Sequence, residues 1–244
     1  MYTVSDIKVK LLNKDEVKDF IKNHGEVASV CYNSDKKYAD KIGLKCMESG
    51  HFSGCRGDYF KFEIECPRFT ADQIVRHEIG VFKNMQSQRY VDEENIDIYC
   101  PAHLFNDDIA RYKIKQFEIT TSIYYKDIKN ECKKLGYEDE KANDLVRGML
   151  PIGVKTKLVV GFTLEALINF MNKRLCSRAD LPIRTVARLM RELIIDIEPR
   201  YEKLLVPQCE ANLFCTEDKS CGRVPKKEDL EKIYKDYYNS IKKE

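Results

Sequence analysis

The chain has 244 residues, of which 43% are hydrophobic and 34% charged, a composition that suits one ordinary core beneath a strongly ionic surface. The 42 Lys and Arg residues nearly balance the 40 Asp and Glu residues, so the net charge is only +2. This balance argues against a protein that binds nucleic acid by neutralising its phosphates, because such binding needs a basic surplus or a segregated basic face.

The N-terminal segment shows no targeting or membrane signal. MYTVSDIKVKLLNKDEVKDF carries charges throughout and lacks the apolar core of a signal peptide. No other stretch approaches the roughly 20 apolar residues that a membrane span needs. We therefore expect a soluble, cytoplasmic protein without a membrane partner, whose ten cysteines are reduced thiols.

In the first half of the chain, alternating side chains predict strands over residues 6–12 and 58–67. Phe60, Phe62 and Ile64 would share one face of the second strand. Apolar periodicity predicts helices over residues 13–25, which would end at Gly25, over 26–34, over 35–50, which would end at Gly50, and over 68–78.

In the second half, a long amphipathic helix is predicted from Asp107 to about Leu135, closed by Gly136. It is followed by a helix over 138–150, a strand over 155–163, and helices over 164–176 and 183–201. Beyond Pro207 the chain is polar and loop-like until a charged helix over 228–243. We therefore predict an α+β main domain over residues 1–206 and a polar tail with a C-terminal helix over residues 207–244.

Three cysteines of this tail, Cys209, Cys215 and Cys221, are each separated by five residues. Structural zinc sites usually contain a tight Cys-x2-4-Cys pair, which is missing here, and no fourth ligand is evident. The sequence therefore predicts reduced thiols and no metal site.

Residues 73–91, QIVRHEIGVFKNMQSQRYV, concentrate polar side chains in one short stretch. Arg supplies a planar fork that matches a phosphate or an imide edge, Ser a hydroxyl, and Gln an amide that both donates and accepts. Such a group can line a nucleotide site at the end of a helix. The alternative is an ordinary charged helix surface.

The stretch resembles the signature of the flavin-dependent thymidylate synthases, which reads Arg-His-Arg, seven residues, then Ser. Here Arg76-His77-Glu78 is followed by eight residues and then by Ser87-Gln88-Arg89-Tyr90. Further segments resemble the family in the same order, namely VASVCYNS, GHFSGCRGDYFKFEIEC, LVRGMLP, TLEALINFMNKRLCSRADLPIR and the tail PQCEANLFCTEDKSCGR. The resemblance covers roughly residues 5–223.

The resemblance implies an α+β fold with a small antiparallel sheet and long helices, assembled as a homotetramer with active sites at subunit interfaces. It implies methylation of dUMP to dTMP, with methylenetetrahydrofolate as carbon donor, FAD as hydride carrier and NADPH as reductant. In such enzymes no protein nucleophile attacks the pyrimidine, and the flavin carries the difficult step.

The resemblance also assigns residues. Arg174 would face the uracil as the catalytic cation that favours the N3-deprotonated base. The side chains implied to bind dUMP are Gln73, Arg76, Gln86, Ser87, Gln88, Arg89, Arg147 and Arg174. The side chains implied to contact FAD are His51, Ser53, His77, Glu78, Thr163 and Asn169.

Three charges are reversed relative to the family pattern. Glu78 and Glu165 replace Arg, and Arg56 replaces a common Glu. At ~5 Å and an effective dielectric of ~20, one such interaction is roughly 3 kcal/mol, so a carboxylate beside the FAD pyrophosphate would be costly. The compensation would be a swapped pair of Arg56 with Glu78, or a positive charge from Lys155, Lys157 or Lys173.

These departures leave two alternatives to a working synthase. One is a homologue that binds a pyrimidine nucleotide but hydroxymethylates it or has lost catalysis. The other is a non-enzymatic module that binds nucleic acid or protein through its Lys- and Tyr-rich C-terminus, which the near-neutral charge disfavours.

Overall fold

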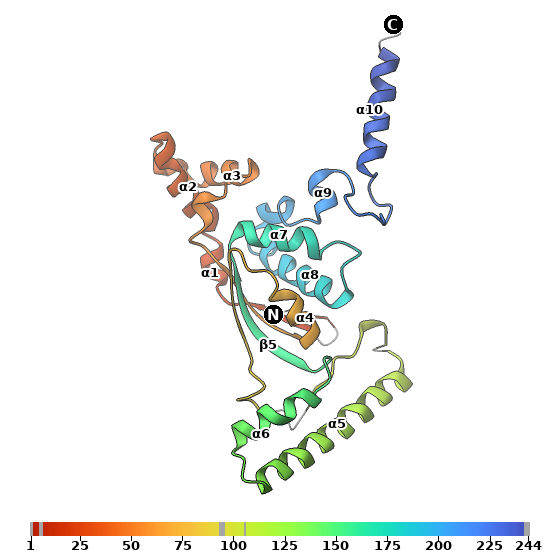
Figure 1. Cartoon of the computed structure of the whole chain (residues 1–244). Helices are drawn as coiled ribbons and strands as arrows, with labels where there is room; N and C mark the ends of the chain where they lie inside the picture. Colours follow the sequence, from red (N-terminus) through yellow and green to blue (C-terminus); the bar gives the residue numbers. More distant parts are fainter. Residues whose placement is uncertain (1, 5–6, 93–95, 105, 242–244) are drawn as a thin grey trace. The chain divides into compact units, whose positions relative to one another are not determined.

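The computed structural model describes residues 2–4, 7–92, 96–104 and 106–241 (Figure 1). The chain forms two compact units, each built from two separate segments. The first unit comprises Met1–Lys14 and Tyr59–Phe162, and the second comprises Asp15–Asp58 and Thr163–Glu244. The division proposed at residue 206 stays a prediction.

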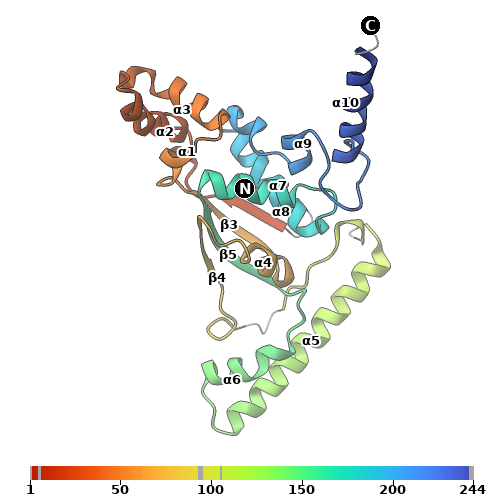
Figure 2. The same cartoon turned by 45° about the horizontal axis from the view of Figure 1, so that its top comes forward.

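A five-stranded antiparallel sheet organises the first unit (Figure 2). Its order is β1-β2-β3-β5-β4, with β1 (Tyr2–Val4), β2 (Ile7–Leu11), β3 (Phe60–Pro67), β4 (Val81–Met85) and β5 (Lys155–Phe162). In β3 the predicted alternation is confirmed, since Phe60, Phe62 and Ile64 are buried. The small antiparallel sheet confirms the α+β prediction; Asp6, within the first predicted strand, lies outside the described residues.

The edge strand β4 was not predicted from the sequence. It pairs with β5, and Phe82 lies opposite Gly161. A Cβ atom at Gly161 would lie 2.1 Å from the Phe82 ring, so the glycine leaves the space that this ring fills. The ring centroid of Tyr59 lies 5.4 Å from that of Phe82. The strand therefore depends on partners distant in sequence, which local periodicity does not reveal.

Three α-helices of the first unit are α4 (Arg68–Ile74), α5 (Asp108–Lys134) and α6 (Asp139–Val146), with 3₁₀ helices η4 (Ala102–Leu104) and η5 (Arg147–Met149). As predicted, α5 is long: the Asp107 side chain accepts from two backbone N–H groups at its start, and Gly136 follows its end with φ +91°. The predicted helix over 68–78 is too long, because α4 ends at Ile74.

Among the described residues, a small apolar cluster and a buried lysine support α5 from within its own unit. Tyr125 packs with the buried side chains of Ile96, Val146 and Val154. The Lys129 ammonium, 2% exposed, lies 2.5 Å from a carboxylate oxygen of Asp92. Many large apolar side chains of this helix are exposed, namely Ile109, Tyr112, Phe117, Ile119, Ile123 and Tyr124.

The second unit begins with α1 (Lys14–Val17), α2 (Phe20–Ser29) and α3 (Ala39–Glu48), with η1 (Val30–Tyr32), η2 (Lys36–Tyr38) and η3 (Ser53–Cys55). The prediction that a helix ends at Gly25 was wrong, because α2 continues to Ser29. A Cβ atom at Gly25 would lie 1.6 Å from the carbonyl oxygen of Ala39, and one at Gly43 would lie 1.9 Å from that of Ile21. The glycines therefore permit close packing of α2 against α3.

The second unit continues with α7 (Leu164–Arg174), α8 (Leu181–Ile195), η6 (Pro199–Lys203), α9 (Gln208–Asn212) and α10 (Lys227–Ile241). The predicted helix over 183–201 ends earlier, and η6 starts at a proline that cannot donate a backbone hydrogen bond. Residues 242–243 of the predicted terminal helix lie outside the described residues. Among the described helices, none combines the length and apolar character required to cross a membrane.

Candidate functional site

Arg89 and Arg147 meet at one carboxylate in the first unit. Arg89 Nε lies 3.5 Å and Arg147 Nη2 3.1 Å from Asp144 Oδ1. Arg89 Nη2 also donates a hydrogen bond to Glu140 Oε1 at 3.0 Å. Both carboxylates lie on α6, and Arg147 follows its last residue. The two guanidinium groups are nearly half-exposed, so they are held together and still reach solvent.

Ser87 belongs to the same group because it forms the turn that carries Arg89. The Arg89 amide donates to Ser87 Oγ at 3.3 Å, and the Tyr90 amide donates to the Ser87 carbonyl at 3.3 Å. Asn143 Nδ2 on α6 donates to the Arg89 carbonyl at 3.2 Å. The turn is thus fastened to α6. We call Ser87, Arg89, Asp144 and Arg147 the arginine cluster.

The arginine cluster can bind a compact anion. A phosphate dianion takes charge-assisted hydrogen bonds from guanidinium groups, and the hydroxyl of Ser87 can add a neutral one. Asp144 and Glu140 now neutralise these cations. An incoming dianion would compete with them for the same donors.

Arg76, His77 and Glu78 lie at the other end of β4 from this cluster. A five-residue strand is roughly 17 Å long, so Arg76 is not part of the arginine cluster of its own chain. The Val81 amide donates to the Glu78 carbonyl at 3.2 Å, and Gly80 has φ +71°, as the third position of a type II turn requires. This turn and β4 take up the eight residues between Glu78 and Ser87.

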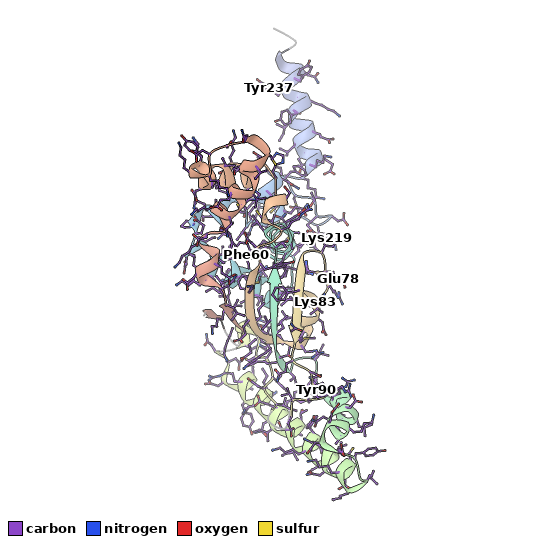
Figure 3. The ribbon with its side chains drawn as sticks, turned by 90° about the vertical axis from the view of Figure 1, so that its left-hand side faces the viewer. Phe60, Glu78, Lys83, Tyr90, Lys219 and Tyr237 are labelled. Carbon is purple, nitrogen blue, oxygen red and sulfur yellow. The ribbon has the colours of Figure 1, made fainter. Side chains whose placement is uncertain are left out.

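Lys83 on β4 fixes the backbone of this turn. Its ammonium donates to the Val75 carbonyl and, at 3.4 Å, to the His77 carbonyl. Figure 3 shows Glu78 and Lys83 near each other at the sheet edge, and Tyr90 beside α6. Arg76 and Glu78 are exposed, whereas His77 is half-buried.

The three predicted glutamines are half-buried and flank these elements. Gln73 lies in the last turn of α4. The Gln86 amide donates to the Lys157 carbonyl at 2.9 Å, which extends the pairing of β4 with β5 by one residue. Gln88 lies between Ser87 and Arg89 in the turn. All three therefore belong to the chain segment, residues 73–89, that also contains the predicted nucleotide residues Arg76, Ser87 and Arg89.

The predicted flavin residues of the second unit lie on two segments that an ion pair connects. Exposed His51 and Ser53 lie in the loop after α3, and Thr163 precedes α7. Arg56, from the same loop, places its Nη2 3.3 Å from an Oε2 of Glu165 in the first turn of α7. The buried Thr163 hydroxyl accepts from the Ala166 amide at 3.4 Å and caps α7.

This ion pair joins two of the three reversed charges. Arg56 is paired with Glu165, which corrects the expectation that its partner would be Glu78. Of the lysines considered as replacements, Lys155 pairs with Asp97 at 2.8 Å and Lys157 Nζ lies 3.9 Å from Glu65. The described contacts therefore identify a partner for two of the three reversed charges, Arg56 and Glu165, and do not identify one for Glu78.

Beneath the loop with His51 and Ser53 lie buried titratable groups. Burial lowers the pKa of His24, while hydrogen bonding to the backbone of His51 and Gly54 partly opposes this. Burial raises the pKa of the Cys55 thiol to about 12, and the charges of Asp58 and Cys46 add to the shift. Cys55 is thus a thiol at neutral pH, unsuited to act as a nucleophile.

Asn169 and Arg174 both lie on α7, with Asn169 exposed and Arg174 half-buried at the last residue. They belong to the second unit, whereas the arginine cluster belongs to the first. Within single units, the structure brings together Ser87, Arg89 and Arg147, and it connects the segments of His51 and Thr163.

Sequence reasoning missed the residues that position the arginines. Asp144 precedes Arg147 by three residues on a helix, a spacing at which side chains meet, so this pair was open to prediction. The bonds of Asn143 to Arg89 and of Lys83 to Val75 depend on tertiary packing and have no local signal.

Comparison with known proteins places these observations in a family. The family model described as thymidylate synthase complementing protein matches residues 14–200. A protein named flavin-dependent thymidylate synthase from Nitratidesulfovibrio vulgaris is 34% identical over 187 residues, 75% of this chain and 76% of its own length. Proteins of the same name are 36% identical in Pyrococcus furiosus, over 69% of both chains, and 28% identical in Clostridium tetani, over 93% of this chain and 97% of that one.

Proposed function

The chain belongs to the thymidylate synthase complementing protein family, and we propose that it is a flavin-dependent thymidylate synthase that methylates dUMP to dTMP. Methylenetetrahydrofolate is the proposed carbon donor and NADPH the proposed reductant. The single structural observation that supports this function best is the arginine cluster, in which Arg89 and Arg147 meet at one carboxylate oxygen of Asp144 and the Ser87 hydroxyl holds the turn that carries Arg89.

In this proposal the dUMP phosphate binds at the arginine cluster. Arg89 and Arg147 exchange their shared carboxylate for phosphate oxygens, and the Ser87 hydroxyl donates to a third oxygen. The half-buried Gln86 and Gln88 border the nucleotide from the same turn. Arg76 lies at the far end of β4, so it contributes to a site completed by another subunit.

Arg174 is the proposed catalytic cation. A guanidinium group against the uracil favours the N3-deprotonated base, whose C5 is the more nucleophilic carbon. The location of Arg174 at the C-terminal end of α7 keeps its charge favourable toward the helix dipole. No enzyme nucleophile takes part, in keeping with the high pKa of the buried Cys55 thiol.

FAD is the proposed cofactor, and the exposed polar groups of the second unit fit it. His51, Ser53 and Asn169 present solvent-facing donors and acceptors, and Glu165 is already paired with Arg56. When bound, reduced flavin would supply the hydride for the transferred carbon. The resemblance also assigns His77 and Glu78 to this cofactor, and the Glu78 carboxylate would be unfavourable beside its pyrophosphate.

A homotetramer is part of the proposal because α5 exposes a large apolar surface. Of its described side chains only Tyr125 and Lys129 are buried, whereas Ile109, Tyr112 and Tyr124 are at least 60% exposed. Monomers rarely expose such contiguous apolar patches without a partner. Light scattering after size exclusion is expected to give four times the 28.5 kDa chain mass, and a 28.5 kDa particle would refute the tetramer.

The function is tested by titrating the purified protein with FAD, then with dUMP, and by an anaerobic assay for dTMP with methylenetetrahydrofolate and NADPH. We expect a flavin spectrum that changes on dUMP addition, followed by dTMP formation. Retention on a polyanionic resin without any response to dUMP would instead identify a non-enzymatic binding module.

The exposed Glu78 carboxylate favours a second candidate, a homologue that binds dUMP but forms a hydroxymethyl nucleotide or no product. A carboxylate near the pyrophosphate would weaken FAD binding. Mass spectrometry of the assay mixture separates the cases, since hydroxymethyl and methyl products differ by one oxygen atom. dUMP binding without any new nucleotide would select lost catalysis.

Arg89→Ala tests the phosphate site directly. One charge-assisted hydrogen bond contributes ~1.5–3 kcal/mol, so we expect the Kd of dUMP to rise roughly 10- to 150-fold. Binding of deoxyuridine, which lacks the phosphate, should change far less. Arg111→Ala removes another surface arginine, paired with Asp108 on α5, and is the matched control. Equal losses for dUMP and deoxyuridine would contradict the phosphate role.

A further inference from the structure

Four cysteines from three separate parts of the second unit line a single cavity. Cys176 follows α7, Cys209 lies in α9, and Cys215 and Cys221 lie in the loop beyond it. The sequence analysis singled out the last three, and no fourth ligand was evident there. The structure supplies Cys176, 33 positions before Cys209, because α7 packs beside α9.

The size of the cavity restricts what it can hold. Its volume is about 20 Å³. A space of ~10–15 Å³ on this measure holds one water molecule, so the cavity suits one small particle and excludes an organic cofactor. The four cysteines that line this space supply the soft sulfur ligands that a structural zinc site uses.

The charges around the cavity favour thiolates. Arg178 and Arg223 line it together with the four cysteines. A zinc ion with four thiolates carries two net negative charges. Glu217 also lines the cavity, 3.9 Å from Arg178 Nε, so the two guanidinium groups and this carboxylate together supply one positive charge and offset half of them.

The described contacts that hold the surrounding loop are mostly polar. Arg178 Nη1 donates to the Lys219 carbonyl at 3.0 Å, and Cys215 pairs with Lys226 in an isolated bridge. Leu213 is 75% exposed and has φ +62°, a backbone conformation that side chains other than glycine rarely adopt. A polar loop of this kind buries little apolar surface and gains stability from a metal cross-link.

We propose that Cys176, Cys209, Cys215 and Cys221 bind one zinc ion as a closed, structural site. Binding converts four thiols to thiolates and releases four protons, without any change of oxidation state. Among the described residues no ligand group is already assembled around a metal position, so the thiols must turn inward by rotation about their Cα–Cβ bonds. Four protein ligands leave no open coordination position, so the site fastens the tail and performs no catalysis.

The test uses the full-length protein, reduced and freed of metal, and titrates it with Zn²⁺ against a chromogenic chelator. We expect one zinc per chain, bound with a sub-micromolar Kd, and a rise in Tm. Four thiols should lose their reactivity toward a thiol reagent. Co²⁺ in place of Zn²⁺ should show the thiolate charge-transfer and visible bands of a tetrahedral sulfur site.

Cys176→Ser should weaken zinc binding by more than about 100-fold, because loss of an outer-shell partner alone costs 10- to 100-fold. Cys31→Ser, at an exposed cysteine outside the cavity, is the matched control and should bind zinc as the natural protein does. Circular dichroism of both variants separates misfolding from ligand loss. Zinc binding unaffected by Cys176→Ser would overturn the proposal. So would no binding by folded, reduced protein at ~10 µM Zn²⁺, a concentration well above the ~50 nM Kd that corresponds to a binding free energy of ~10 kcal/mol.

Discussion

At the scale of single residues, two of the three charge reversals of this chain form one exchanged ion pair, and the described contacts show no partner for the third, Glu78. Arg56 and Glu165 replace residues of opposite sign and meet at 3.3 Å. Each change alone would place like charges together. Made together, they keep an ion pair between the loop with His51 and the start of α7. The ion pair between Arg56 and Glu165 therefore accounts for two of the three departures from the family pattern.

We expect exchange of the pair to be better tolerated than reversal of either member. Arg56→Glu should weaken FAD binding a few-fold, because two carboxylates then face each other across the loop. Adding Glu165→Arg should restore the affinity. Both side chains are more than half exposed, so the coupling free energy in a double-mutant cycle should stay within about 1 kcal/mol.

Isothermal titration with FAD measures each corner of this cycle. The control is Arg188→Glu, a charge reversal at an exposed arginine of α8 that is paired with Glu192. Additive effects of the two reversals on the FAD Kd would show that the pair does not orient the loop.

At the scale of elements, the close approach of two helix backbones explains why the sequence analysis placed a helix end wrongly at Gly25. Glycine near the end of an amphipathic pattern commonly ends a helix, which is true at Gly50 and Gly136, where φ is positive. Gly25 lies inside α2, at the point where α3 leaves no room for a side chain. Sequence alone does not distinguish a glycine needed for φ from one needed for space.

Gly25→Ala should strongly destabilise the protein. The added Cβ would lie 1.6 Å from the Ala39 carbonyl oxygen, a backbone atom that cannot move without displacing α3. Overpacking typically costs ~1–3 kcal/mol, and we expect the upper end, a fall in Tm of roughly 6–12 °C for a chain of this size.

Gly57→Ala is the control, since a Cβ atom there meets nothing within 4 Å and the backbone does not require glycine. Differential scanning calorimetry should give it a Tm close to that of the natural protein. A Tm equally unchanged in Gly25→Ala would mean that α2 and α3 pack less closely than described.

The elements that the sequence predicted well are those whose stability is local. The long helix α5 has a capping Asp107 and a terminal Gly136, and β3 shows strict alternation. The edge strand β4 depends on pairing with β5 and on the space over Gly161. Because this strand was not predicted from the sequence, the prediction of a single polar group over residues 73–91 did not show that Arg76 and Arg89 lie at opposite ends of a strand.

At the scale of the whole molecule, the chain interleaves its two units. The first unit holds Ser87, Arg89 and Arg147, and the second holds His51, Asn169 and Arg174. The resemblance named these residues, whereas Asp144, Asn143 and Lys83, which fix the arginines and the turn, came from packing. A motif in the sequence can identify the proposed binding residues. It does not identify the residues that hold them in place, because those contacts join parts of the chain that are distant in sequence.

Buried His24 connects global stability to pH. Its side chain is 2% exposed, and burial lowers its pKa below the ordinary value of 6.5. Between the folded-state pKa and 6.5, His24 is protonated in the unfolded chain but not in the folded chain. The free energy of unfolding therefore falls as the pH drops below 6.5 toward the folded-state pKa. The largest possible slope for one group is ~1.4 kcal/mol per pH unit. We therefore expect a loss of up to about 1 kcal/mol between pH 6.5 and 5.5.

Urea unfolding of the natural protein from pH 7.5 to 5.5 measures this loss, and His24→Gln should flatten the profile because it keeps a polar side chain that does not titrate. His103→Gln removes an exposed histidine and is the matched control, which should retain the natural slope. The carboxyl of Asp58 titrates in the opposite sense, since burial raises its pKa from 3.8 and favours the folded state at acid pH. If the free energy of unfolding of His24→Gln keeps the natural dependence on pH, the acid sensitivity belongs to another group. His24 would then be protonated in the folded chain without a loss of stability.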